Sequence, residues 1–194
     1  MAVVATPMPA PPHAPDPRPP WVACVIAAQA GDRHAFAALH RDFGAMVHGL
    51  LLARVDPSTA DDLTQEVFLS AWQRLDRLHE PLAWPSWLAT IARNRALDHV
   101  RADRRADRRP GTLPPELATA APDPATRTEA EQLLAHIREL PDALVEPLIL
   151  RLVEGLSGPE IAERTGLSPG YVRVNLHRGM AALRARLDPN GGMR

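Results

Sequence analysis

The stretch "LSGPEIAERTGLSPGYVRVNLHRGM", residues 156–180, constrains the fold more than any other part of this sequence. Ser157 followed by Glu160 has the spacing of a capping box and predicts that a helix begins there. Gly166 supplies the positive φ that ends such a helix, and Ser168 is placed to cap the next one. Two helices joined by so short a turn predict a helix-turn-helix.

The second helix of this pair, residues 169–187, has the composition of a DNA recognition helix. Its apolar spacing directs Val172, Leu176, Met180 and Leu183 inward. The side chains left outside have hydrogen-bonding tips or guanidinium groups, which suit base edges and phosphates. They are Tyr171, Arg173, Asn175, His177 and Arg178. The alternative is an ordinary helical hairpin with a solvated arginine face.

Four further helices are expected over residues 21–105. The first, "WVACVIAAQAG", ends in a glycine, and Asp32 is placed to cap the second. Ser58 and Asp61 have capping-box spacing at the start of the third helix. The fourth starts near Pro85. Only 4% of the residues are aromatic, so the core is expected to consist of Ala, Leu, Val and Ile, which favours helices.

The fold class predicted is therefore all-α, with two small helical domains joined by a flexible linker and a helix-turn-helix in the second. Residues 1–20 hold eight of the 21 prolines and are expected to form a disordered tail. The domains are expected at 21–106 and 128–188, and the Pro-rich segment 107–127 is expected to be the linker. Pro147 removes a backbone donor and is expected to distort its helix locally.

The charge is concentrated rather than spread. All 22 basic residues are arginine and the formal net charge is -1, yet residues 92–109 hold seven arginines against three aspartates. This local excess favours a polyanionic partner.

Several function classes lack support in the sequence. Cys24 is the single cysteine, so there is no disulfide framework, and it is expected to be a buried, inert thiol. No catalytic triad, phosphate loop or paired-carboxylate pattern appears, so we expect neither an enzyme nor a bound cofactor or metal. The sequence has no candidate membrane span or signal peptide, which predicts a cytoplasmic protein without membrane insertion.

Three segments together resemble one family. They are "ADDLTQEVFLSAWQRL", "WLATIARNRALDHVR" and "LPDALVEPLILRLVEGLSGPEIAERTGLSPGYVRVNLHRGMAALRARL", and in this order they resemble the extracytoplasmic-function (ECF) class of bacterial sigma factors. The resemblance implies that 21–106 is sigma region 2, which binds core RNA polymerase and the minus-10 promoter element. It implies that 128–188 is sigma region 4, which binds the minus-35 element.

The resemblance also implies residue roles. The polar face of the third helix, here Asp62, Gln65 and Glu66, would dock on a coiled coil of the polymerase. The fourth helix and the loop before it would bind the minus-10 strand through Trp84, Arg93, Asn94, Arg95, Arg101, Arg104 and Arg105. Trp87 is expected in the core. The minus-35 element would be bound by Ser168, Gly170, Tyr171, Arg173, Val174, Asn175, His177 and Arg178.

The recognition helix departs from the usual pattern of the family. Tyr171 stands where a threonine is common, Val174 where a serine is, and Asn175 where an arginine is. Asn pairs well with adenine and Val contacts the thymine methyl, so a shift toward A/T is expected at one or two positions. The resemblance further implies an inhibitory anti-sigma factor as a partner, besides core polymerase and promoter DNA.

Two other hypotheses remain open from the sequence alone. One is a two-domain helix-turn-helix transcriptional regulator without sigma activity, although residues 21–105 show no strand pattern for a receiver domain. The other is a metal or redox sensor built on Cys24 and the histidines. His34, His40 and His48 lack the i, i+4 spacing that places two ligands on one helix face.

Overall fold

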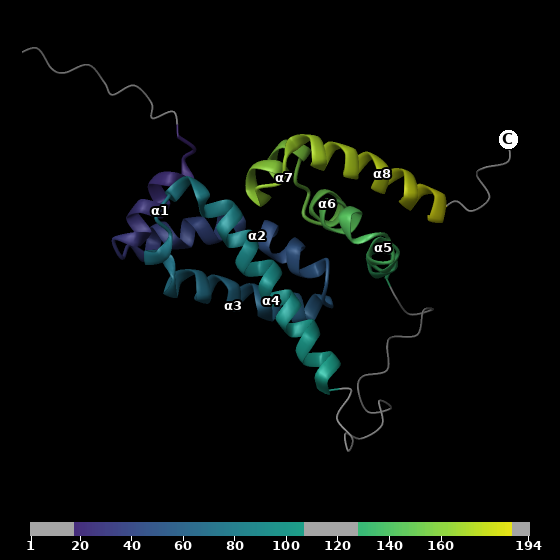
Figure 1. Ribbon diagram of the computed structural model, residues 1–194, viewed down its shortest axis with the longest axis horizontal. Helices are drawn as coiled ribbons and strands as arrows, with labels where there is room; N and C mark the ends of the chain where they lie inside the picture. The colour runs from purple at the N-terminus through teal and green to yellow at the C-terminus, as the bar shows by residue number, and fades with distance from the viewer. Residues whose placement is uncertain (1–17, 107–127, 188–194) are drawn as a thin grey trace, which may run out of the picture.

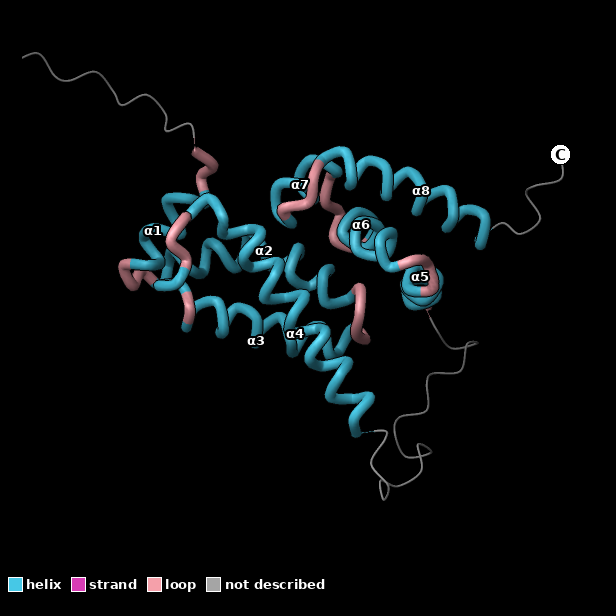
Figure 2. The backbone as a smooth tube through the Cα atoms, in the orientation of Figure 1, coloured by secondary structure: helices cyan, strands magenta, loops and turns pink. Residues whose placement is uncertain are grey.

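The computed structural model describes residues 18–106 and 128–187, and these residues form helices, turns and loops with no strand among them. Figures 1 and 2 show two groups of helices lying against each other. The all-α prediction is confirmed for this part of the chain. The predicted tail lies almost wholly outside the described residues, and the linker lies outside them entirely.

The first unit consists of the four predicted helices: α1 (Trp21–Gln29), α2 (Arg33–Leu52), α3 (Pro57–Gln73) and α4 (Trp84–Ala106). Two short 3-10 turns, Leu75–Arg77 and Pro81–Ala83, connect α3 to α4. The buried side chains of this unit come mainly from the apolar stripes of α2, α3 and α4.

The N-terminal caps in this unit agree with the sequence at one helix and differ at another. Asp32 caps α2, because its Oδ1 accepts hydrogen bonds from the backbone N–H groups of His34 (2.8 Å) and Ala35 (3.2 Å). The predicted Ser58 cap of α3 is wrong. Asp56 accepts from the Thr59 N–H at 3.0 Å instead, because Pro57 already occupies the first helical position.

The second unit consists of α5 (Glu129–Arg138), α6 (Asp142–Leu152), α7 (Gly158–Thr165) and α8 (Pro169–Leu187). Thr128 and Ser157 both form complete capping boxes, with Glu131 and Glu160 respectively. α6 continues through Pro147 without interruption, so the distortion expected at this proline does not break the helix.

The two units share one continuous buried cluster. It includes Leu39 and Phe43 from the first unit and Leu148 and Ile149 from the second. The contacts are made chiefly by α6 against α2 and by α7 against α4 and α2. Figure 1 shows α6 and α7 beside the ends of α2 and α4. The sequence predicted two separate helical domains and did not predict this contact.

Candidate nucleic-acid interface

The outer face of α3 carries the three residues predicted to bind a protein partner. Asp62, Gln65 and Glu66 are all exposed. Leu69 completes this face at 58% exposure, since it follows Gln65 by four residues and Glu66 by three. Sequence reasoning missed Leu69 because a single leucine beside a buried stripe looks like part of the core. Its spacing from the polar residues was the available signal.

A groove of about 490 Å³ separates α3 from α4. Its lining includes Glu66 and Leu69 from α3 and Asn94 and Arg95 from α4. Glu66 and Arg95 form an ion pair of 2.6 Å across it, with both side chains about half exposed. An exposed pair of this kind contributes little stability, so both groups are available to other partners. The structure thus brings Glu66, which is predicted to bind polymerase, next to Asn94 and Arg95, which are predicted to bind DNA.

Trp84 does not lie where the sequence placed it. We expected this side chain to stack on unpaired bases, but it is 0% exposed at the start of α4. Its ring lies 6.2 Å from that of Phe36, 6.1 Å from that of Phe43 and 5.7 Å from that of Trp87. The prediction of a DNA contact is wrong for this structure, because the residue fills the middle of an aromatic cluster. Trp87 is partly buried against the same core.

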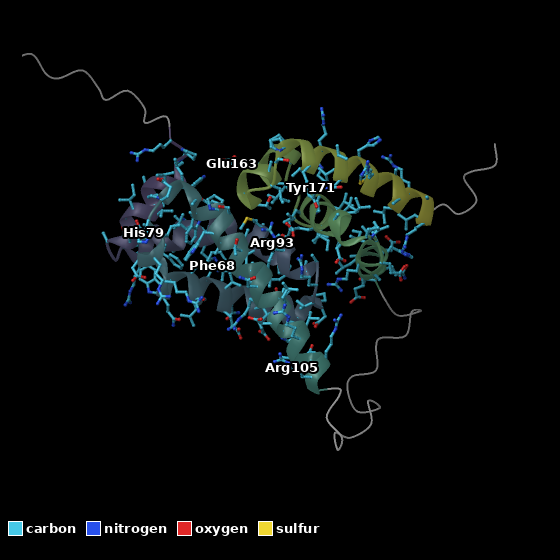
Figure 3. All side chains as sticks on the ribbon, viewed as in Figure 1. Phe68, His79, Arg93, Arg105, Glu163 and Tyr171 are labelled. Atoms are coloured by element: carbon cyan, nitrogen blue, oxygen red, sulfur yellow. The ribbon has the colours of Figure 1, made fainter. Side chains whose placement is uncertain are left out.

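The polar residues predicted on α4 fall into two groups. Asn94, Arg95, Arg101, Arg104 and Arg105 are exposed. Figure 3 shows Arg105 near the free end of α4, and Arg93 close to the second unit. Arg93 is half-buried and donates two hydrogen bonds to the carboxylate of Glu146, at 2.6 and 3.2 Å. The exposed group can neutralise a phosphate backbone, whereas Arg93 is held by an anionic partner that is itself buried.

The turn between α7 and α8 has the geometry that its sequence predicts. The Ser157 Oγ accepts from the Glu160 N–H at 3.3 Å, and the Glu160 carboxylate accepts from the Ser157 N–H at 2.8 Å. Hydrogen bonding of the Glu160 carboxylate with the side chain and the backbone N–H of Ser157 lowers the pKa of Glu160. Gly166 adopts a φ of 74°, and the Ser168 Oγ accepts from the Tyr171 N–H at 3.2 Å. The helix-turn-helix is confirmed, and Ser168 has a capping role in it.

The exposed face of α8 and the capping residue before it contain all but one of the residues predicted to bind the minus-35 element. They are Ser168, Gly170, Tyr171, Arg173, Val174, His177 and Arg178. Tyr171 is 43% and Val174 42% exposed, so both present large side chains to a partner. A hydrogen-bonding and cationic face of this kind can enter a major groove.

Asn175 is the exception. It is only 7% exposed, on the buried stripe of α8 with Val172, Gly179 and Leu183. A Cβ added at Gly179 would lie 2.8 Å from Leu148 Cδ1, so α8 lies close against α6 at this glycine. Asn175 lies one turn before Gly179 and is turned inward with it. The expectation that Asn175 faces outward is therefore wrong.

The residues expected in a sensor site are not gathered together. Among residues 18–106 and 128–187 no group of three or more His, Cys, Asp or Glu side chains could hold a metal ion. Cys24 is partly buried against the core rather than fully buried. No helix within these ranges is long and apolar enough to cross a membrane.

Two families match the chain in the order of its two units. Sigma-70 region 2 matches residues 39–106, and Sigma-70 region 4 matches residues 130–183. The first match covers α3 and α4, and the second covers the helix-turn-helix. The segments that carry the candidate sites are therefore those that the families describe.

Curated relatives match over both units. The RNA polymerase sigma factor CarQ of Myxococcus xanthus is 35% identical over 161 residues, which are 81% of this chain and 91% of CarQ. The ECF RNA polymerase sigma factor SigF of Caulobacter vibrioides is 34% identical over 136 residues, which are 68% of this chain and 72% of SigF. The chain spans only 35% of the length of another curated relative that it matches.

A solved structure shares the arrangement of helices. CnrH, in complex with the cytosolic domain of CnrY, is similar with a TM-score of 0.59 and 25% identity, over 88% of this chain and 98% of CnrH. Together with the two family matches and the relatives, this similarity establishes the family. The chain belongs to the ECF class of RNA polymerase sigma factors.

Proposed function

We propose that this protein is an alternative sigma factor, which binds core RNA polymerase, recognises minus-35 and minus-10 promoter elements and promotes promoter opening. It would act by binding, without catalysis of its own. The observation that carries this proposal is that one chain combines two kinds of surface. The helix-turn-helix has an exposed face with arginines on α8, and the first unit has a basic α4 beside the polar face of α3. The two family matches cover these same elements.

The face of α3 supports the role in polymerase binding. Asp62, Gln65 and Glu66 lie on the same helix face as the exposed Leu69, within two turns of it. A surface with acidic and amide groups around one apolar side chain suits a helix that is basic and partly apolar. We therefore add Leu69 to the proposed contact.

The exposed side of α4 supports the role at the minus-10 element. Asn94, Arg95, Arg101, Arg104 and Arg105 can neutralise the phosphates of an unpaired strand. Trp84 leaves the proposed site because it is fully buried. Arg93 belongs to it only when its contact with Glu146 is broken.

The minus-35 contact is proposed for the outer face of α8. Arg173 and Arg178 can donate to guanine or to phosphate, and Val174 can contact a thymine methyl group. Tyr171 and His177 add hydrogen-bonding tips, while Ser168 and Gly170 allow the helix to begin close to the DNA backbone. Asn175 is left out because it is buried.

An inhibitory partner and a cytoplasmic location are also proposed. The structure of the similar protein CnrH was solved with a second polypeptide, the cytosolic domain of CnrY. A comparable protein that masks α3 and α4 would act as an anti-sigma factor for this chain.

Run-off transcription tests the proposal. Purified core polymerase is combined with wild-type protein, Asp62→Arg or Arg173→Ala on a pool of genomic promoters. Wild type should direct discrete start sites, Asp62→Arg should abolish them, and Arg173→Ala should weaken them. Asp76→Arg is the matched control, since Asp76 is exposed outside the α3 face. DNA binding by the wild type without initiation anywhere would favour a regulator that lacks sigma activity.

A further inference from the structure

Arg93 of α4 is bound by the second unit. Its guanidinium donates two hydrogen bonds to Glu146 of α6, and the Arg54 Nη1 of the first unit lies 3.7 Å from the same carboxylate. Glu146 is 8% exposed, so the contact is largely shielded from solvent. A bidentate arginine–carboxylate pair in such a position is stronger and more specific than a surface ion pair.

A second arginine contact ties α5 to the end of α2. Arg138 donates hydrogen bonds from Nε to the Leu52 carbonyl, at 2.9 Å, and from Nη2 to the Val55 carbonyl. The Leu52 carbonyl belongs to the last turn of α2, where it has no partner within the helix. The second unit therefore supplies a C-terminal cap to a helix of the first.

Two further polar contacts join α2 to the second unit, at residues that precede the end of the helix. His48 of α2 forms a 2.7 Å hydrogen bond with Glu154, which follows α6, and its Nε2 lies 3.4 Å from Asp61 of α3. Arg164 of α7 donates to the Asp42 carbonyl at 2.5 Å, and its guanidinium carbon lies 5.7 Å from the centre of the Phe43 ring. The contacts thus extend along α2 and are not limited to one ion pair.

Two glycines allow the units to approach closely. A Cβ added at Gly49 of α2 would lie 2.7 Å from Leu150 Cδ2 and 2.8 Å from Glu154 Cγ. A Cβ added at Gly166, in the turn of the helix-turn-helix, would lie 2.7 Å from the Cβ of Ser86 in α4. Contacts this close require that no side chain stands between the elements.

We propose that these contacts form an autoinhibitory clasp, in which the second unit holds the free chain closed and withholds Arg93 from the minus-10 strand. The clasp is defined by Arg93–Glu146, Arg138 with the end of α2, and His48–Glu154. Its regulatory meaning rests on the proposed sigma function, whereas its existence does not. The closed clasp occupies the Nε and Nη2 donors of Arg93 and pairs its charge with a carboxylate, so a phosphate can bind this side of the guanidinium only after Glu146 has left it.

Closure affects the two DNA-binding elements unequally. Arg173, Val174, His177 and Arg178 stay exposed on α8. Tyr171, in contrast, lines a pocket of about 290 Å³ together with Arg54, Arg93 and Glu146. The closed chain therefore leaves most of the minus-35 face free, and on the minus-10 side it restrains Arg93 while the other arginines of α4 stay exposed.

Covalent linkage favours closure. The two units belong to one chain, with 107–127 between their described parts, so the contact forms within one molecule. Linkage of this kind acts like an effective concentration on the order of millimolar. A contact of modest intrinsic strength is then sufficient to keep the free chain closed.

Pulsed electron paramagnetic resonance on the full chain tests the clasp. Spin labels are placed at Arg77→Cys and Ala181→Cys in a Cys24→Ser background, since both labelled positions are exposed and lie in different units. Glu146→Arg sets a third arginine beside Arg54 and Arg93. Glu163→Arg is the matched control, because it makes the same charge change at an exposed position of α7, away from Arg93 (Figure 3).

The clasp predicts a single narrow distance for the wild type and for Glu163→Arg. Glu146→Arg should add a longer-distance population, with the open-to-closed ratio raised at least about tenfold. Circular dichroism should show unchanged helix content in both variants. A broad distribution in the wild type, or a narrow wild-type distance retained in Glu146→Arg, would overturn the clasp.

A functional measurement separates the clasp from the proposed function. Open-complex formation is followed at limiting sigma concentration, and Glu146→Arg should form complexes faster than wild type, while Glu163→Arg should not. An opened Glu146→Arg chain with an unchanged rate would overturn the autoinhibitory role. If no variant initiates transcription, the proposed function fails, and the distance measurement still decides whether the clasp exists.

Discussion

Replacement of Gly49 by alanine should have opposite effects on α2 and on the clasp. Gly49 is in the interior of α2, and its added Cβ would meet Leu150 Cδ2 at 2.7 Å and Glu154 Cγ at 2.8 Å, both from the second unit. Gly44 lies on the same helix with nothing within 4 Å of an added Cβ. Gly44→Ala therefore makes the same change in open space and serves as the matched control.

The expected magnitudes follow from these distances. Alanine is favoured over glycine in a helix interior by about 1 kcal/mol, so both variants should raise the free energy of unfolding of the first unit. Excess volume in a packed contact costs typically ~1–3 kcal/mol, and this cost falls on Gly49→Ala alone. The open-to-closed ratio should then rise roughly 5- to 150-fold in Gly49→Ala.

Two measurements check this expectation. The distance between labels at Arg77→Cys and Ala181→Cys reports opening, and urea unfolding reports the stability of the helices. Gly44→Ala should be closed and more stable than wild type, whereas Gly49→Ala should open. A Gly49→Ala chain as closed as the wild type would refute the reasoning, since the added methyl group fits the closed form only if the Leu150 and Glu154 side chains move away.

Three further outcomes are expected. The hydrogen bond to Glu154 raises the pKa of His48 in the closed chain. Protonated His48 therefore stabilises closure fully below the ordinary histidine pKa of about 6.5, and this stabilisation is lost as the pH rises through the raised value. The label distance should therefore lengthen with rising pH in wild type but not in His48→Gln. Ser157→Ala removes a capping box and should lower the free energy of unfolding by about 1 kcal/mol, as urea unfolding would show. Arg173→Ala should weaken binding to duplex promoter DNA roughly tenfold and leave the free energy of unfolding unchanged, since Arg173 is exposed. Asn175→Ala should lower the free energy of unfolding and leave DNA binding unchanged, since Asn175 is buried.

Local features of the sequence were sufficient to predict the helix-turn-helix. Ser157, Glu160 and Gly166 act within a few residues of themselves, through caps and a positive φ, and the structure contains each of these features. The four helices of the first unit follow in the same way from apolar spacing and from the Asp32 cap. The α3 cap was missed because Asp56 and Ser58 both precede plausible helix starts, and the choice depends on where Pro57 falls.

The burial of single side chains was harder to predict. Trp84 is at a helix start and is suitable for stacking on bases, but three aromatic rings from other positions enclose it. Asn175 has the polarity of an outer residue, but the close approach of α8 to α6 at Gly179 turns it inward. In both cases the burial depends on residues far away in the sequence.

The sequence by itself determined the helices, most of their caps and the family, because these depend on residue type and on spacing within a few turns. Only the tertiary structure decided that the two units share a core, that Arg93 is bound to Glu146 and that His48 is bound to Glu154. These pairs are separated by 53 and 106 residues. No local pattern specifies which distant charges meet, since that depends on how whole helices pack against each other.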